Sequence, residues 1–134
     1  MAEGFKFELV SPERLLVSKE VEAVVIPGAD GEMTVLAQHA PTMTTIKPGV
    51  VTVKPVAGAE ERYVVFGGFA DILPEGCTLL AESAVAVKDI DRNELSQRIN
   101  NAKEDVADAK SDAMRTRAEQ YLAHLTTLEA ALAA

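Results

Sequence analysis

The sequence predicts a β-sandwich followed by an α-helical hairpin, and two observations carry this prediction. All eight glycines and all six prolines lie between Gly4 and Gly76, and none follows. These residues form turns in a sheet but cost about 1 and 3 kcal/mol, respectively, inside a helix. Apolar residues also follow strand-like alternation early in the chain and helical spacing later. In this chain of 134 residues we therefore expect a sandwich domain at 1–87 and a helical domain at 88–134.

The first expected strand begins near the N-terminus. Phe5, Phe7 and Leu9 alternate with Lys6 and Glu8. Successive side chains of a strand point to opposite faces, so the three apolar residues share one face. This pattern predicts an amphipathic strand at an edge or on the surface of the sandwich.

Further expected strands are short and rich in Val, Ile, Thr and Phe, and Gly or Pro divides them. Many short strands without intervening helices favour antiparallel pairing. The expected ranges are 21–26, 33–36, 50–53, 63–66, 69–73 and 78–81, with dividers at 27–28, 48–49, 67–68 and 74–76.

The segment from Gly28 to Gly31 contains two glycines but lacks the Lys-Ser/Thr ending of a phosphate-binding loop. Its Asp30-Gly31 pair instead suits a hairpin turn that needs positive φ. We therefore expect residues 32–37 to return as a strand.

Two apolar stripes at helical spacing follow Asp89. Asp89 or Asp91 can cap the first helix, and Ser111 or Asp112 the second, which gives an antiparallel hairpin. Because no Gly or Pro marks the turn, one long helix remains an alternative. The stripes are Leu95, Ile99, Ala102, Val106 and Ala109, then Ala118, Tyr121, Leu125, Leu128 and Leu132.

These stripes are narrow and rich in alanine, so the hairpin should bury little apolar area. It is therefore expected to be the less stable half and the candidate moving element.

Composition excludes several classes of function. A net charge of -8 disfavours the basic surface that nucleic-acid binding requires.

The single cysteine, Cys77, cannot form an intramolecular disulfide and lies in an expected buried strand, which suggests a reducing compartment. The first residues lack an export signal. No apolar run approaches the roughly 20 residues needed to cross a bilayer, so membrane association would come through a partner.

No catalytic or metal-binding constellation is visible. His39 and His124 lie in different halves, and no His, Cys or carboxylate pair has a zinc-ligand spacing. The serines occupy no nucleophile-elbow context. We expect a protein that is not an enzyme, with no cofactor, no metal and no catalytic residue.

Several ordered segments resemble the epsilon subunits of F-type ATP synthases. The resemblance covers nearly the whole chain and agrees with the β-then-α division. Its central segment is Pro27-Gly-Ala-Asp-Gly-Glu-Met-Thr-Val-Leu-Ala-Gln-His-Ala-Pro41, followed by Ile46-Lys-Pro-Gly49. Phe7-Glu-Leu-Val-Ser-Pro-Glu-Arg14, Phe66-Gly-Gly-Phe-Ala-Asp-Ile-Leu73 and Leu80-Ala-Glu-Ser-Ala84 are similar to the family's other strands.

The resemblance implies a non-catalytic rotor subunit in the central stalk, which couples rotation of the membrane c-ring to ATP synthesis in the catalytic head. It also implies a peripheral position on the cytoplasmic face of the bacterial inner membrane. By similarity, the residues expected to face the c-ring are Glu32, His39, Ala40 and Pro41. Those expected to face the gamma subunit are Met43 and Val50.

In this family the hairpin can also extend toward the alpha and beta subunits of the head and restrain ATP hydrolysis. Arg115 and Arg117 supply positive charge for that contact, but Asp112, Glu119 and Glu129 dilute it. We therefore expect either weak inhibition or inhibition that is left to another subunit.

Some relatives bind ATP through Ile/Leu-Asp-any-any-Arg-Ala, and an ATP sensor is the alternative function. Ile90, Asp91 and Arg92 begin that motif, but Glu94 stands where it has arginine. The simpler interpretation of these residues is a capped helix start.

Overall fold

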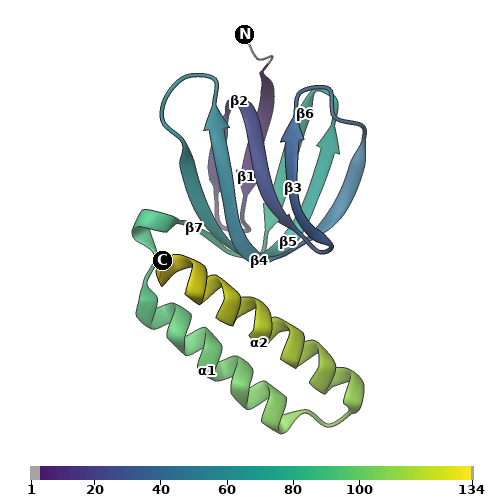
Figure 1. The fold of residues 1–134 in the computed structure, drawn as a ribbon, viewed down its shortest axis with the longest axis vertical. Coiled ribbons are helices and arrows are strands. Elements are labelled where there is room, and N and C mark those ends of the chain that lie inside the picture. Colours follow the sequence, from purple (N-terminus) through teal and green to yellow (C-terminus); the bar gives the residue numbers. More distant parts are fainter. Residues whose placement is uncertain (1–3, 134) are drawn as a thin grey trace. The chain divides into compact units, whose positions relative to one another are not determined.

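The computed structural model describes residues 4–133. The chain divides into two compact units, Met1–Lys88 and Asp89–Ala134 (Figure 1). The first contains strands and the second a helical hairpin, which confirms the predicted fold class. The strands are β1 (Phe5–Val10), β2 (Leu15–Gly28), β3 (Gly31–Leu36), β4 (Thr42–Pro55), β5 (Glu61–Leu73), β6 (Gly76–Ala81) and β7 (Ala84–Ala86). A 3-10 turn, η1 (Val87–Asp89), precedes α1 (Arg92–Asp108) and α2 (Asp112–Ala133).

The strands form two layers that share β2, β4 and β5. What we call the β7 layer consists of β3, the second halves of β2 and β4, the first half of β5, and β7. The β1 layer consists of the first half of β2, β1, β6, the second half of β5 and the first half of β4. Because the shared strands cross from one layer to the other, pairing closes into a ring through β1, β6, β5, β4 and β2.

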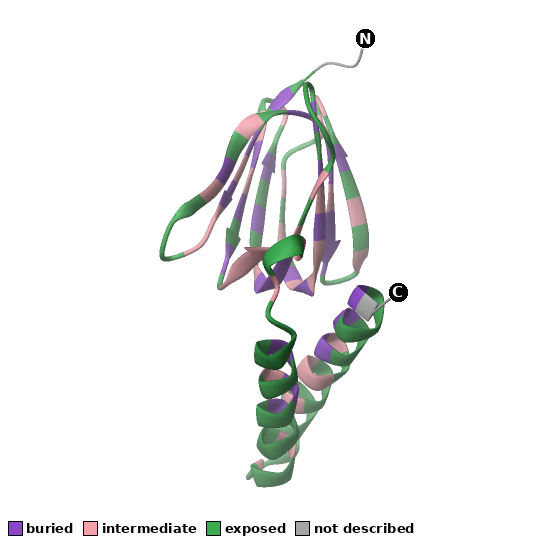
Figure 2. Ribbon diagram, turned by 90° about the vertical axis from the view of Figure 1, so that its left-hand side faces the viewer, coloured by how far each residue is buried: buried purple, intermediate pink, exposed green. Residues whose placement is uncertain are grey.

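The core lies between these layers. Phe5, Phe7 and Leu9 are buried, as their alternation with charged residues predicted. Figure 2 shows the same alternation of buried and exposed residues along the other strands. Other members of this core cluster are Val17, Val21, Val24, Ile26, Val35, Ile46, Val51, Val53, Val65, Ala70, Ile72, Cys77, Leu79 and Ala81.

Of the two predicted positions for β1, at an edge or on the surface, the edge was wrong, because one face of β1 meets solvent but both of its sides are paired. It pairs with β2 in antiparallel fashion and with β6 in parallel, as in Phe7↔Lys19 and Phe7↔Cys77. Alternation reports which face of a strand meets water, not whether the strand has a neighbour on each side. The exposed Lys6 therefore marks only the outer face of β1.

Pro48-Gly49 was predicted to divide strands but lies inside β4, which is longer than expected. The register between β2 and β4 shifts here, because Val25 pairs with Thr52 whereas Gly28 pairs with Ile46. A Cβ on Gly49 would lie 2.7 Å from Cβ of Pro27, so only glycine admits this close approach. The residues mark an irregularity within one strand.

Gly67-Gly68 also lies inside a strand, β5, and not between two strands as predicted. Their φ angles are +103° and +145°, which non-glycine residues rarely adopt. The pair therefore lets β5 pass from one layer to the other. Two other predicted turns are confirmed: the β2–β3 hairpin closes with Gly31 at φ +137°, and the turn after β5 leads into β6 at Gly76.

The helices form the predicted hairpin, and the single-helix alternative was wrong. The side chain of Asp91 caps α1 by accepting from the backbone N–H groups of Asn93 and Glu94. Ser111 Oγ accepts from the backbone N–H of Met114 at 3.1 Å and caps α2. In the described part of the chain, neither helix is long and apolar enough to cross a membrane. The buried residues follow the predicted stripes: Leu95, Ile99 and Ala102 in α1, and Leu125, Leu128 and Leu132 in α2.

Candidate functional site

The loop between β3 and β4 contains three of the four residues expected to face the c-ring. Ala40 and Pro41 are exposed and His39 is half-buried. His39 Nδ1 lies 2.7 Å from the backbone carbonyl of Ala40, which also accepts from the Thr42 hydroxyl at 3.1 Å. A carbonyl can only accept, so Nδ1 carries a proton and Nε2 remains available to a partner.

Gln38 anchors this loop to the β1 layer. Its φ of 64° places it in the left-handed region, which is costly for a residue with a side chain. Its backbone N–H donates to the carbonyl of Pro74 in the turn between β5 and β6, at 3.1 Å. The contact therefore fixes His39, Ala40 and Pro41 against a second turn of the sandwich.

Glu32 lies apart from the loop that contains His39, Ala40 and Pro41. It is exposed near the start of β3, whereas the loop begins after Leu36 at the other end of that strand. Strands rise about 3.3 Å per residue, so roughly 13 Å of strand separates Glu32 from Leu36. The four expected residues thus form one loop and one separate carboxylate.

Met43 lies at the margin of an apolar outer surface on the β1 layer, because it pairs with Asp71 and is only diagonal to Phe69, whose own partner is Thr45. We call Val10, Leu15, Met43, Phe69 and Leu80 the apolar face. In register, Leu15 lies opposite Val10, Val10 opposite Leu80 and Leu80 opposite Phe69. Exposure reaches 65% for Met43, 52% for Leu15, 50% for Leu80 and 42% for Phe69. Contiguous exposed apolar side chains of this kind usually mark an interaction site.

Of the apolar face, only Met43 was predicted from the sequence as an exposed contact residue. The signal was present in β5, where the large Phe69 and Leu73 alternate with Ala70 and Ile72. Alternation alone does not reveal which set lies inside. The structure buries Ala70 and Ile72 and exposes Phe69 and Leu73.

Val50, the other residue expected to face gamma, lies on a different surface. It is half-buried and pairs with Val64 in the β7 layer, whereas Met43 pairs with Asp71 in the β1 layer. Val51 and Val53, which alternate with Val50 and Thr52 along β4, belong to the core. The structure therefore does not bring Val50 and Met43 together.

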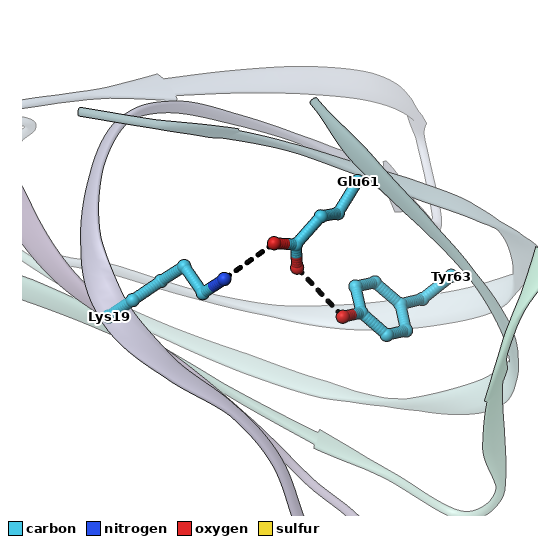
Figure 3. Close-up of polar contacts among 3 residues, drawn as sticks. All are labelled: Lys19, Glu61 and Tyr63. Carbon is cyan, nitrogen blue, oxygen red and sulfur yellow. Dashed lines mark hydrogen bonds and ion pairs between the residues drawn. The ribbon is translucent and has the colours of Figure 1, made fainter. Parts of the chain in front are cut away.

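A polar cluster that the sequence did not reveal joins the two layers. The Lys19 ammonium lies 2.5 Å from the Glu61 carboxylate, and the Tyr63 hydroxyl donates to the same carboxylate at 2.8 Å (Figure 3). Lys19 comes from the β1 layer and the other two from the β7 layer. Lys19 and Glu61 are 42 residues apart, so no local pattern could pair them.

This cluster shifts the titration of its members. The hydrogen bond from Lys19 holds the pKa of Glu61 below its usual value, against the opposing effect of burial, and Tyr63 and the charge of Lys88 lower it further. Burial, reinforced by the bond to Glu61, raises the pKa of Tyr63 to about 12. Because Lys19 and Glu61 already neutralise each other, we interpret the cluster as a tie between the layers rather than a reactive centre.

Two of the three residues that begin the nucleotide-binding motif, Asp91 and Arg92, stabilise the hairpin itself. Asp91 caps α1, and Arg92 donates from Nη2 to the carbonyl of Leu132 at 2.8 Å. Glu94, where the motif has arginine, lies 3.6 Å from Arg98 in an ion pair on the same helix. This arrangement offers no guanidinium at the motif's arginine position.

The described residues contain no metal-binding cluster, and their one cysteine is held in an unreactive form. No group of three or more His, Cys, Asp or Glu side chains in residues 4–133 could hold a metal ion. Burial, with a smaller contribution from Asp71, raises the pKa of the Cys77 thiol to about 12. The unreactive thiol form therefore dominates at neutral pH.

Two family models match the sequence. Residues 4–87 match the model described as "ATP synthase, Delta/Epsilon chain, beta-sandwich domain", and residues 91–134 match the model of the C-terminal domain of the ATP synthase epsilon chain. Among curated relatives, a protein named ATP synthase epsilon chain from Mesorhizobium japonicum is 76% identical over 132 residues, covering 98% of both chains. One of the same name from Rhizobium meliloti is 65% identical over 128 residues, covering 96% of this chain and 95% of the relative.

Solved structures show the same fold. A chain in the cryo-EM structure of the Euglena gracilis mitochondrial ATP synthase, OSCP/F1/c-ring, superposes with a TM-score of 0.75 at 29% identity, covering 96% of this chain and 81% of that one. A chain from the Tetrahymena thermophila mitochondrial ATP synthase central stalk/c-ring gives a TM-score of 0.72 at 9% identity, covering 96% and 98%. The second likeness concerns the fold alone.

Proposed function

Because this chain belongs to the ATP synthase epsilon chain family, we propose that it is a non-catalytic rotor subunit of the central stalk of an F-type ATP synthase. It turns with the gamma subunit and the c-ring and couples proton-driven rotation to ATP synthesis. The related Euglena gracilis chain belongs to an assembly described as OSCP/F1/c-ring, which supports this setting. On this proposal the protein is peripheral, on the cytoplasmic face of the bacterial inner membrane.

The apolar face is the observation that carries the proposal. A subunit that transmits torque needs a contact that resists sliding, and a continuous apolar surface can bury area against gamma. Met43 contributes to that surface, together with Leu15, Phe69 and Leu80. Val50, on the other layer, stays a separate proposed contact, because one flat partner surface would not reach both residues.

The loop of His39, Ala40 and Pro41, with Glu32, is proposed to face the c-ring. The carbonyl of Ala40 is already occupied by His39 and Thr42, so the loop presents the Nε2 edge of His39 to a partner. Such an edge can accept a hydrogen bond when neutral or pair with an acid when protonated. Glu32 would make a second contact at a distance from the loop.

Binding of purified gamma tests the apolar face. Phe69→Asp places a charge within this face, beside Leu80, without removing a core side chain, so we expect gamma affinity to fall at least about tenfold. Thr34→Asp is the matched control, because Thr34 is exposed on β3 in the other layer. Equal affinity of both variants for gamma would reject the docking surface, provided that circular dichroism shows each folded.

The hairpin is proposed as a regulatory element with a weak inhibitory effect on ATP hydrolysis. We take the functional boundary at 87/88 and expect residues 1–87 to fold and bind gamma alone. The test compares ATP hydrolysis by complexes reconstituted with the full chain and with a chain ending at Val87. A rise of severalfold with the truncated chain would contradict weak inhibition and show a strong restraint.

The alternative, an ATP sensor acting through the hairpin, has less support. Arg92 and Glu94 are engaged with Leu132 and Arg98, so binding would have to break existing contacts. Ligand binding to the folded state raises the melting temperature. An increase with millimolar ATP, absent with millimolar inorganic phosphate, would revive this alternative.

A further inference from the structure

The open end of the helical hairpin contains a contact between distant parts of the chain. Arg92 is the first residue of α1, and its Nη2 donates to the backbone carbonyl of Leu132 in the last turn of α2, at 2.8 Å. The two residues are 40 positions apart. At the other end, residues 109–111 join the helices covalently. Only non-covalent contacts can hold the open end closed.

Electrostatics explain why an arginine stands at this position. A cation in the first turn is unfavourable for its own helix, whose N-terminus carries partial positive charge. The last turn of α2 contains no basic residue of its own, and its final carbonyls lack intrahelical partners. Arg92 supplies both the missing charge and a donor to one of those carbonyls. Its position therefore serves α2 rather than α1.

The side chains packed near this contact would be exposed if the contact broke. Leu128 and Leu132 are buried on α2, and Leu95 is buried one turn after Arg92 on α1. Separating the helices at this end would expose those side chains and leave the carbonyl of Leu132 without its charged donor. Since the stripes are narrow, one charge-assisted bond is a large share of what holds this end.

We propose that Arg92 is an interhelical latch, which ties the first turn of α1 to the last turn of α2 and keeps the open end of the hairpin closed. The latch is a property of the isolated chain and does not depend on the proposed role in ATP synthase. Any rearrangement that separates the two helices must first break it.

Amide hydrogen exchange of the isolated full-length protein tests the latch. Arg92→Glu should favour α1, because an acid suits its first turn, while repelling the negative end of α2. We expect exchange of the amides of residues 128–132 to become at least about tenfold faster, with little change in the middle of α1. Arg92→Gln, which removes the charge but not the polar group, should give a smaller acceleration.

Arg115→Glu is the matched control. It makes the same change of charge, but the Arg115 guanidinium pairs with Asp112 in the first turn of its own helix, at 3.1 Å, far along α2 from Leu132. Exchange at residues 128–132 should therefore stay as in the unmodified chain. Equal acceleration by the two Glu variants, or no acceleration by any Arg92 variant, would overturn the latch. If Arg92→Glu unfolds the hairpin, Arg92→Gln decides by the same criterion.

Discussion

The sandwich and the hairpin are stabilised in different ways. In the sandwich, large side chains such as Phe7, Ile26 and Leu79 are fully buried inside a ring of paired strands. In the hairpin, each helix buries only a narrow stripe, and one of its buried positions is an alanine, Ala102. Buried apolar area is the main source of stability, so the sandwich should be the more stable unit.

The two units also differ in how far apart in sequence their contacting residues are. The sandwich joins residues far apart in sequence, as where Phe7 lies between Lys19 and Cys77 in neighbouring strands. A substitution that disturbs one strand should therefore destabilise the whole ring of strands. In the hairpin most hydrogen bonds join residues that are close in sequence within one helix. A destabilising substitution there should therefore affect only nearby residues.

The largest expected effect is the loss of a central core side chain. Phe7→Ala should lower the free energy of unfolding of the sandwich by about 3–5 kcal/mol, because it removes a ring that is fully buried and leaves a cavity. Urea unfolding followed by NMR signals of β1 and β5 measures it. Phe69→Ala, at a half-exposed Phe, should cost less than half as much. Comparable losses for both variants would contradict the assigned core.

A single methyl group at Gly68 should be nearly as damaging. Its φ is +145°, and an added Cβ would lie 2.1 Å from the carbonyl oxygen of Leu80, inside contact distance. Strain and displacement of β6 together should cost about 3 kcal/mol in Gly68→Ala. The urea midpoint of the sandwich reports this cost.

Gly58 provides the control for the backbone angle alone. Its φ is +107°, but no atom lies within 4 Å of an added Cβ. Gly58→Ala should cost about 1 kcal/mol. A cost at Gly68 no larger than at Gly58 would mean that β5 does not need the close approach to β6.

The sequence predicted the two units and many elements because those signals are local. Residues past Gly76 contain no Gly or Pro, Phe5 to Leu9 alternate, and Asp91 and Ser111 are good N-caps. Each depends on a few neighbouring residues. This is why the fold class and the break between the helices could be predicted.

The wrong predictions came from sequence patterns that are compatible with more than one structure. Gly67-Gly68 can end a strand or let it bend between layers, and only the nearness of Leu80 distinguishes these cases. In the same way, the partners of Glu61 and the outward direction of Phe69 depend on strands brought together by the fold. Such non-local contacts are invisible in a single sequence.

Truncation of a core side chain in the hairpin should destabilise the helical unit without destabilising the sandwich. Leu125 is fully buried in α2, so Leu125→Ala should destabilise the helical unit by about 2–3 kcal/mol while β-strand amides remain protected. Native-state hydrogen exchange distinguishes the units. Thr126→Ala, at an exposed neighbour, should change neither. Loss of protection in the strands of Leu125→Ala would show that the units unfold together.

The smallest expected effect concerns the tie between the layers. The pKa of Glu61 is lowered in the folded state, so its contribution is complete well above the unfolded value of 4.5 and is lost as pH falls through the folded value. Since the pair with Lys19 is partly exposed, we expect less than about 1 kcal/mol. Glu61→Gln should therefore be less stable than the unmodified chain at pH 7, and this difference in the free energy of unfolding should narrow by pH 3.

Glu60→Gln, at the exposed neighbouring position, should show no such gap at either pH. A gap for Glu61→Gln that does not change with pH would mean that the carboxylate acts through shape alone, and that the two layers are held by their common core without an ionic tie.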